Sequence, residues 1–374
     1  MRTELDSNTR AWLSLKLTPA LGNISVLKLL ERFGSPEAAC AAGWEDLRSL
    51  IGLREEAKAS LLSGRTIRAV EEEWQALRAR GWGLICLGDP DYPENLKNIP
   101  DPPAILYATR SPEPRDLVAI AVVGSRSASP MGLVFTERLC ADLARRGVTV
   151  VSGFALGIDS AAHRGAIKGG GRTLAVLGCG LDVIYPRPNA DLRDQVMTHG
   201  AFLTEFPLGT PPLAGHFPQR NRIISGLALG VVVVEATAKS GSLITARFAL
   251  EQGREVFAVP GIARNLRSLG PHLLLRQGAI LVESADDILE QIQPMIRPST
   301  SEVLTEEAPL SSSSTELSDA EASLLKRLGA EPKHVDQICR ESGLNASIVT
   351  ATLLALEIKG LVRQMPGKYF MRLS

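Results

Sequence analysis

The sequence predicts an α/β protein built on a doubly wound, mainly parallel sheet, with a small helical domain before it and a winged-helix domain after it. In the middle of the chain, short β-branched runs alternate with amphipathic helical stretches, which is the pattern of βαβ units. The segments before residue 83 are helical throughout, and the last part combines helices with two short strands. We therefore expect four parts: a helical domain (1–82), the sheet domain (83–293), a linker (294–317) and the winged helix (318–374).

The composition excludes several classes of protein. The 374 residues include 41 basic and 41 acidic side chains, so any affinity for nucleic acid has to come from a local patch. No stretch approaches the roughly 18 apolar residues of a membrane span, and the first residues lack the apolar run of a signal peptide. The five cysteines are scattered, without a C-x-x-C pair. We expect a cytoplasmic protein with no membrane contact, no disulfide framework and no metal or other cofactor.

Residues 1–82 are expected to form short amphipathic helices separated by tight turns. These helices are Ala11–Lys16, Ile24–Phe33, Ala38–Ala41, Trp44–Leu50, Glu55–Leu62 and Arg65–Arg80. Two turns, Pro19–Asn23 and Leu50–Leu53, resemble helix-hairpin-helix turns, in which a glycine exposes backbone N–H groups to a phosphate. A helical cap with ordinary glycine turns fits these residues equally well.

The middle of the chain supplies the strands of the sheet and the helices that connect them. The expected strands are Leu84–Leu87, Val118–Val123, Thr149–Ser152, Thr173–Leu177, Phe202–Thr204, Val231–Glu235, Glu255–Val259 and Ile280–Val282. Several are short and continuously apolar, as strands buried on both faces are. The expected helices are Gly132–Arg146, Asp159–Lys168, Ala190–Thr198, Arg220–Leu229 and Leu243–Gln252. Helical crossovers between strands favour a parallel sheet.

The C-terminal region begins with the segment Pro298–Thr315, whose Ser, Thr, Glu and Pro residues predict a flexible linker. Ser318 then begins a helix that runs to Leu328, with Glu321 completing a capping box. The remaining expected elements are helices Val335–Ser342 and Ala346–Lys359 and wing strands Leu361–Gln364 and Lys368–Met371. Helix 346–359 has Lys359 as its only basic residue and therefore favours protein packing; sequence-specific reading of duplex DNA is the alternative.

In doubly wound sheets, ligands bind beyond the carboxyl ends of the strands. The candidate residues that follow the first three strands of the parallel sheet are Gly124, Ser125, Arg126, Ser152, Gly153 and Arg187. The glycines permit tight turns and expose backbone amides, and each arginine presents a donor fork suited to a phosphate. The alternative for Arg126 is an ordinary pairing with a surface carboxylate. We expect Asp159, which would repel an anion, to organise its loop and cap the next helix, and His163 to be structural, within hydrogen-bonding reach of Asp159.

A second group of candidates lies at the start of two later helices. Its members are Phe217, Arg220, Asn221 and Arg222, and then Lys239, Ser240, Gly241 and Ser242. Arginines on a first helical turn oppose the macrodipole unless a bound anion offsets the cost, so the first set indicates an anion site. Phe217 is a candidate platform for base stacking; alternatively it lies in the core, and Arg220 pairs with Glu205 or Glu235. The second set presents a charge, two hydroxyls and free amides.

Motifs typical of nucleotide-dependent and hydrolytic enzymes are missing from the sequence. There is no G-x-x-x-x-G-K-[ST] sequence, which argues against ATP hydrolysis, and no G-x-G-x-x-G in the first strand–helix turn, which argues against a dinucleotide cofactor. No nucleophile–base pair has a recognisable spacing. Several phosphate-binding positions along one edge of a sheet suit the backbone of a single-stranded nucleic acid better than a mononucleotide.

The motifs, in their order, resemble the DNA-processing protein A family, also called Smf. They are Asp91-Tyr92-Pro93, Asp101-Pro102-Pro103, Gly124-Ser125-Arg126, Ser152-Gly153, Gly157-Ile158-Asp159, Tyr185-Pro186, Phe217-Pro218 with Arg220-Asn221-Arg222, Ser240-Gly241-Ser242 and Pro260-Gly261. The resemblance covers roughly residues 83–290. Met131, Ala228 and Pro271-His272 depart from the usual residues of the family, and none of them removes a basic contact.

This resemblance implies an extended Rossmann-like domain that forms a homodimer and binds single-stranded DNA in a basic pocket. It also implies that the protein protects incoming single strands and loads the RecA recombinase during natural transformation, without being an enzyme. The pocket would use Arg126, the segment Phe217–Arg222 and Lys239. The alternative is a nucleotide-processing enzyme of the phosphoribohydrolase type, since those enzymes resemble this fold. Their P-G-G-x-G-T loop is missing, because Pro260-Gly261 has no such continuation.

Overall fold

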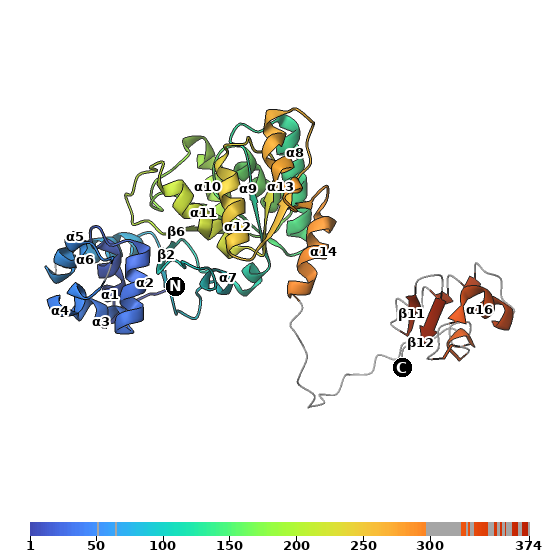
Figure 1. Cartoon of the computed structure of the whole chain (residues 1–374), viewed down its shortest axis with the longest axis horizontal. Helices are drawn as coiled ribbons and strands as arrows, with labels where there is room; N and C mark the ends of the chain where they lie inside the picture. Colours follow the sequence, from blue (N-terminus) through green and yellow to red (C-terminus); the bar gives the residue numbers. More distant parts are fainter. Residues whose placement is uncertain are drawn as a thin grey trace. The chain divides into compact units, whose positions relative to one another are not determined.

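The computed structural model describes residues 1–50, 52–63 and 66–296, together with short stretches between residues 323 and 372 (Figure 1). The chain forms two compact units, Met1–Thr300 and Ser301–Ser374. Within the described stretches, each helix is too short or too polar to cross a membrane.

The first unit is built on a mixed sheet whose described strands have the order β1-β2-β6-β5-β4-β3-β7-β8-β9. They are β1 (Gly83–Cys86), β2 (Ile105–Ala108), β3 (Ala119–Val123), β4 (Thr149–Ser152), β5 (Thr173–Leu177), β6 (Gly200–Thr204), β7 (Gly230–Val233), β8 (Glu255–Ala258) and β9 (Ile280–Leu281). Strands β3 to β9 are parallel, whereas β1 and β2 add an antiparallel edge. The predicted doubly wound, mainly parallel sheet is confirmed, and only β2 is missing from the sequence prediction.

The strand order reverses direction between β3 and β7. From β3 the chain proceeds outward through β4, β5 and β6, and it then returns to place β7 on the other side of β3. The loops that leave β3 and β7 therefore diverge to opposite sides of the sheet. Such a switch point leaves a crevice at the carboxyl ends of the two strands, and this is where ligands of doubly wound sheets bind.

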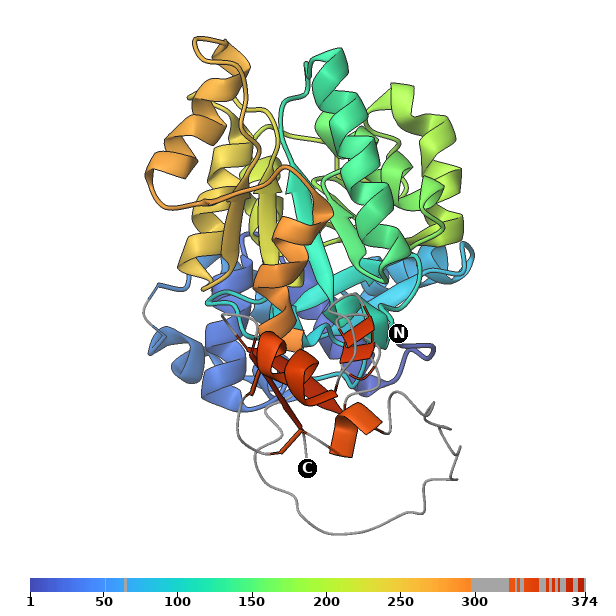
Figure 2. The same ribbon diagram turned by 90° about the vertical axis from the view of Figure 1, so that its right-hand side faces the viewer.

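Helices cover both faces of the sheet, as the two layers in Figure 2 show. One layer contains α8 (Pro130–Arg145), α9 (Ile158–Lys168), α10 (Ala190–His199) and α14 (Ala285–Ile296). The other contains α7 (Glu94–Lys97), α11 (His216–Leu227), α12 (Gly241–Glu251) and α13 (Leu269–Arg276). Side chains of β3 alternate between the layers: Ile120 and Val122 pack on the α8–α9 side, and Ala121 and Val123 on the α11–α12 side.

The N-terminal helices pack directly on the sheet. They are α1 (Ser7–Leu17), α2 (Asn23–Phe33), α3 (Pro36–Ala41), α4 (Trp44–Arg48), α5 (Glu55–Leu62) and α6 (Ile67–Arg78), and all six were expected from the sequence. Trp12, Leu13 and Leu29 share one hydrophobic core with Tyr107 and Phe202 of the sheet.

The turn before α2 is tied to the sheet domain by one side chain. Asn23 donates to the Pro102 carbonyl at 2.9 Å and accepts from the Ala104 amide at 2.8 Å. The phosphate-binding interpretation of the turns at 19–23 and 50–53 stays a prediction, and Ile51 of the second turn lies outside the described residues.

The C-terminal unit contains α16 (Val335–Ser342) and a sheet with the order β10-β12-β11, formed by β10 (Lys333–His334), β11 (Val362–Met365) and β12 (Tyr369–Arg372). The predicted wing is present, with both strands starting one residue later than expected, and β10 was not expected. The linker at 298–315 lies outside the described residues, as do the Ser318–Glu321 cap and most of the helices predicted at 318–328 and 346–359.

Candidate nucleic-acid interface

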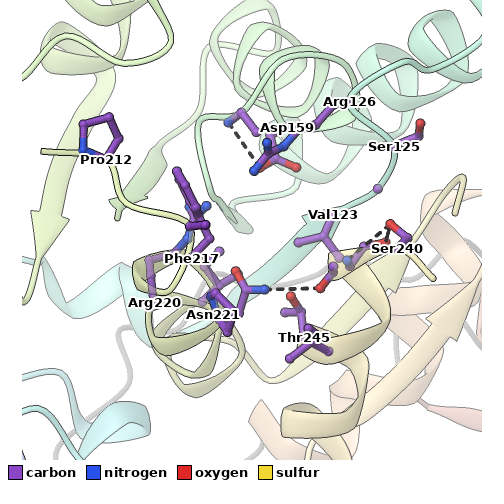
Figure 3. A pocket seen from close by; sticks show the side chains of 18 of the residues that line it. Val123, Ser125, Arg126, Asp159, Pro212, Phe217, Arg220, Asn221, Ser240 and Thr245 are labelled. Atoms are coloured by element: carbon purple, nitrogen blue, oxygen red, sulfur yellow. Dashed lines mark hydrogen bonds between the residues drawn. The ribbon is translucent and has the colours of Figure 1, made fainter. Parts of the chain in front are cut away.

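A cavity of about 550 Å³ opens at the switch point, between the loops that follow β3 and β7 (Figure 3). It falls within the roughly 300–1,000 Å³ range of ligand sites. The expected site residues that line it are Gly124, Ser125, Arg126, Phe217, Arg220, Asn221, Ser240, Gly241 and Ser242. The structure therefore brings together residues from three separate segments of the chain. The charged residues among its lining are two arginines, Arg126 and Arg220, and one aspartate, Asp159.

Two glycines let the loops around the cavity approach each other closely. Gly157, with φ of +79°, packs so tightly that a Cβ atom there would lie 2.2 Å from the Ser125 carbonyl oxygen. A Cβ at Gly124 would lie 3.0 Å from the Glu235 carbonyl oxygen and 2.6 Å from Ile158. Larger residues at either position would push the loops apart, so these glycines set the backbone frame of the site.

Arg126 is free to bind an anion. Its side chain is exposed, and among the residues that the structure describes no carboxylate pairs with it. The guanidinium carbon lies 5.1 Å from the centre of the Phe217 ring, a cation–π distance, which holds the side chain over the cavity. The Tyr185 ring lies 5.8 Å from that of Phe217 and also lines the cavity. An unpaired guanidinium beside two aromatic rings suits a nucleotide, because the phosphate can bind the guanidinium and the base can stack on a ring.

Arg220 lies deeper than expected. Helix α11 begins at His216 instead of Arg220, because Pro218 is tolerated in the first turn of a helix, so Arg220 lies beyond the turn where the macrodipole argument applies. Arg220 is 4 % exposed, its Nη1 donates to the Val176 carbonyl, and its Nε has no partner among the described residues. Burial lowers the pKa of Arg220 to about 10, against the opposing effect of Asp159.

Gly153 accommodates this buried arginine. A Cβ atom at Gly153 would lie 2.1 Å from Nη1 of Arg220. Gly153 is absent from the cavity lining, as is its neighbour Ser152, whose buried hydroxyl donates to the Val122 carbonyl at 2.7 Å. Both residues therefore lie behind the cavity lining and support it.

Arg222 points away from the cavity, which makes its predicted anion contact wrong. Two of its nitrogen–oxygen contacts go to the Glu205 carboxylate, both at 2.7 Å, and others reach the Asp101 carbonyl at 2.7 Å and carboxylate at 3.1 Å. Arg222 and Glu205 are 6 % and 5 % exposed. The carboxylate partner considered for Arg220 thus belongs to Arg222, because residues two apart on a helix face different directions.

The start of α12 forms part of the cavity wall. The Ser240 hydroxyl caps the helix by accepting from the Ser242 amide at 3.4 Å, and the Asn221 side chain donates to the Gly241 carbonyl at 3.2 Å. The helix begins two residues earlier than expected, which places Ser240 at its cap. Lys239 is exposed next to this wall and Arg187 is exposed after β5, but neither side chain lines the cavity.

Asp159 and His163 differ from expectation in their contacts. The helix cap is Gly157, and the Asp159 carboxylate instead accepts from the Ala155 amide at 3.3 Å. Burial raises the pKa of Asp159, and Arg220 partly counteracts it. His163 is fully buried and bonds to the Thr173 hydroxyl at 2.7 Å instead of Asp159. Burial lowers the pKa of His163 to about 3, so it is neutral in the folded protein.

Sequence reasoning missed several uncharged lining residues: Pro212, Ala214, Thr237, Ile244 and Thr245. Their residue types carry no chemical signal, and two of them lie in a loop whose path the sequence does not predict. Thr245 was detectable in principle, since it lies one helical turn after Gly241 and faces the same way.

Comparison with known proteins identifies the family. Residues 83–293 match the family described as DNA recombination-mediator protein A, and residues 307–368 match the DprA winged helix domain. The chain is 43 % identical to Protein Smf of Escherichia coli over 289 residues, which are 76 % of each chain. It is 45 % identical to DNA processing protein DprA of Bacillus subtilis over 221 residues, 58 % of this chain and 73 % of that one.

Solved structures agree with this assignment. DNA processing protein A from Streptococcus pneumoniae superposes with a TM-score of 0.66 at 35 % identity, covering 77 % of this chain and 99 % of that one. The protein of the same name from Helicobacter pylori, solved to explain its single-stranded DNA binding mode, has a TM-score of 0.51 at 28 % identity, covering 57 % and 96 %. The resemblance inferred from the motifs is confirmed, and this chain belongs to the DNA recombination-mediator protein A family.

Proposed function

We propose that this protein binds single-stranded DNA in the switch-point cavity and acts as a recombination mediator, without catalysing a reaction. The observation that carries the proposal is the arrangement around Arg126. Its guanidinium lacks a carboxylate partner among the described residues, is held over the Phe217 ring and lines the same cavity as the start of α12. The guanidinium suits phosphate, and the rings of Phe217 and Tyr185 suit an unpaired base. In a duplex the bases are stacked and unavailable, so this combination favours single strands.

The wider role rests on membership of the family. In this proposal the protein works in the cytoplasm as a homodimer, protects incoming single strands and loads the RecA recombinase on them during natural transformation. The Helicobacter pylori relative, whose structure describes a mode of single-stranded DNA binding, supports the DNA part of the proposal. Lys239 and Arg187, exposed outside the cavity, are candidates to contact neighbouring phosphates of the same strand.

The test is a salt-titrated binding measurement with the full chain. Fluorescence anisotropy would compare a mixed-sequence single strand with the same sequence as a duplex. We expect tighter binding of the single strand, with log K falling by about 0.7 per phosphate contact for each unit of log salt. Arg126→Ala should weaken single-strand binding about tenfold and reduce the slope by about 0.7, since it removes one charge-assisted contact.

Arg138→Ala is the matched control, because Arg138 is exposed on α8 and outside the cavity lining, so it removes the same charge elsewhere. Its affinity and slope should equal those of the unmodified protein. Equal affinity of Arg126→Ala and the unmodified protein at moderate salt would refute the cavity as the DNA site. Release of free base from AMP would instead support the enzymatic alternative of the phosphoribohydrolase type.

A further inference from the structure

The cavity contains one anionic group, the carboxylate of Asp159, whose charge is partly offset by the buried Arg220. Asp159 is 7 % exposed and lines the same cavity as Phe217 and the start of α12. A buried carboxylate in a site for a polyanion repels the phosphates, so its presence calls for another contribution to binding.

The described residues give this carboxylate few strong hydrogen bonds. The Ala155 amide donates to it at 3.3 Å, at the long end of hydrogen-bond distances. The nearby Ser152 hydroxyl already donates to the Val122 carbonyl at 2.7 Å. Arg220 and Arg126 stabilise its charge through space, but within the described part of the chain neither forms an ion pair with it. An ionised carboxyl accepts up to about four hydrogen bonds, so acceptor positions remain for a ligand.

The location of Asp159 matches the edge of a base. Figure 3 shows Asp159 beside Arg126, on the side of the cavity opposite Asn221 and Thr245. Arg126 in turn lies over the Phe217 ring. A base that stacks on Phe217 and extends into the cavity therefore brings its polar edge toward the buried Asp159, while its phosphate remains outside, at the exposed Arg126.

We propose that Asp159 reads the amino group of the base in this cavity, so that the protein prefers cytosine, and more generally amino-bearing bases, over thymine or uracil. This inference rests on the proposed binding of single-stranded DNA. The exocyclic amino group of cytosine donates to a carboxylate, which is the pairing that aspartate and glutamate make with this base elsewhere. Uracil and thymine present a carbonyl oxygen at the same position, and two acceptors facing each other repel.

The first test compares oligo(dC) with oligo(dU) of equal length, about 20 nucleotides, at mildly alkaline pH. These strands have the same charge and lack the 5-methyl group of thymine, so they differ at the pairing edge of the base. We expect the full chain to bind oligo(dC) about tenfold more tightly, the scale of a hydrogen bond to a charged group. Oligo(N4,N4-dimethyl-dC), which has no amino hydrogen, should lose this advantage with the unmodified protein.

The second test uses Asp159→Asn. Its amide oxygen keeps the bond from the Ala155 N–H, and its NH₂ group then faces the cavity as a donor. The preference should therefore shift toward oligo(dU). Asp191→Asn removes the same charge from an exposed position on α10, outside the cavity, and should keep the preference for oligo(dC).

The outcomes separate the two proposals. Equal affinity for oligo(dC) and oligo(dU), or an advantage that dimethylation leaves intact, would overturn base reading by Asp159 while salt-dependent single-strand binding stands. An oligo(dC) preference that persists in folded Asp159→Asn would assign the preference to another residue and overturn the inference as well. If none of the single-stranded oligonucleotides bound, the proposed function itself would be refuted.

Discussion

The most decisive prediction concerns the buried pair of Arg222 and Glu205, because it separates the structural arginine of α11 from the DNA-binding one. We consider Arg222→Met, Glu205→Met and the double variant. The two side chains are buried and are joined by two contacts of 2.7 Å. Removing one partner of such a pair leaves a buried charge without compensation, which costs about 3–5 kcal/mol.

The two single variants should differ in magnitude. Arg222→Met removes both 2.7 Å contacts from the Glu205 carboxylate and leaves the through-space attraction of Lys16, so we expect a loss of up to about 3–5 kcal/mol in the free energy of unfolding. Glu205→Met leaves Arg222 with Asp101, whose carboxylate is 3.1 Å away and partly exposed, so we expect a smaller loss. The double variant should lose less than the sum of the single losses, with a coupling of about 0.5–3 kcal/mol.

Urea unfolding followed by circular dichroism measures these free energies, and salt-titrated DNA binding on the folded variants measures the functional effect. Because Arg222 does not line the cavity, Arg222→Met should keep the salt slope of the unmodified protein. A loss below about 1 kcal/mol, or a slope reduced by about 0.7 as expected for Arg126→Ala, would refute the structural assignment.

Two further predictions concern single side chains. Phe217→Leu should weaken single-strand binding about tenfold, since stacking of a base contributes about 1–3 kcal/mol, and the salt slope should not change because no charge is lost; a changed slope would contradict this reason. His163 has a folded pKa of about 3 against about 6.5 unfolded, so the unfolded state binds the extra proton and stability falls as pH drops through that window. Urea unfolding at pH 7 and pH 5 should show an acid-induced loss about 2 kcal/mol larger than in His163→Gln, and equal losses would rule out this contribution.

Much of the sheet was predictable because its strands have a strong local signal. Short β-branched runs such as Thr149–Ser152 and Thr173–Leu177 are buried on both faces, and their bounds match the structure. Strand β2 was not predictable in this way, since its four residues follow Pro102-Pro103 and pair with β6 across a long stretch of chain. Pairing between distant segments leaves no local pattern in the sequence.

The candidate site was predictable only in part, because side-chain direction depends on the exact start of a helix. Phe217 and Arg126 were identified from their chemistry and their positions after strands or before helices. Arg220 and Arg222 looked equivalent in the sequence, but a helix that starts four residues earlier turns one toward the cavity and the other toward Glu205. The open acceptor positions of Asp159 depend on contacts between loops, which no pattern in the sequence records.

The close approach of the loops at Gly124 and Gly157 has a consequence for how this site can change. Gly157 contacts main-chain carbonyl oxygens, and Gly124 contacts a main-chain carbonyl oxygen and the Ile158 side chain, which does not line the cavity. The outline of the cavity therefore depends little on the side chains that line it. Exchanging a lining residue such as Asp159 or Phe217 should therefore alter what the cavity recognises while its size persists. A scaffold of this kind allows specificity to diverge among related proteins, or to be redesigned, without rebuilding the fold.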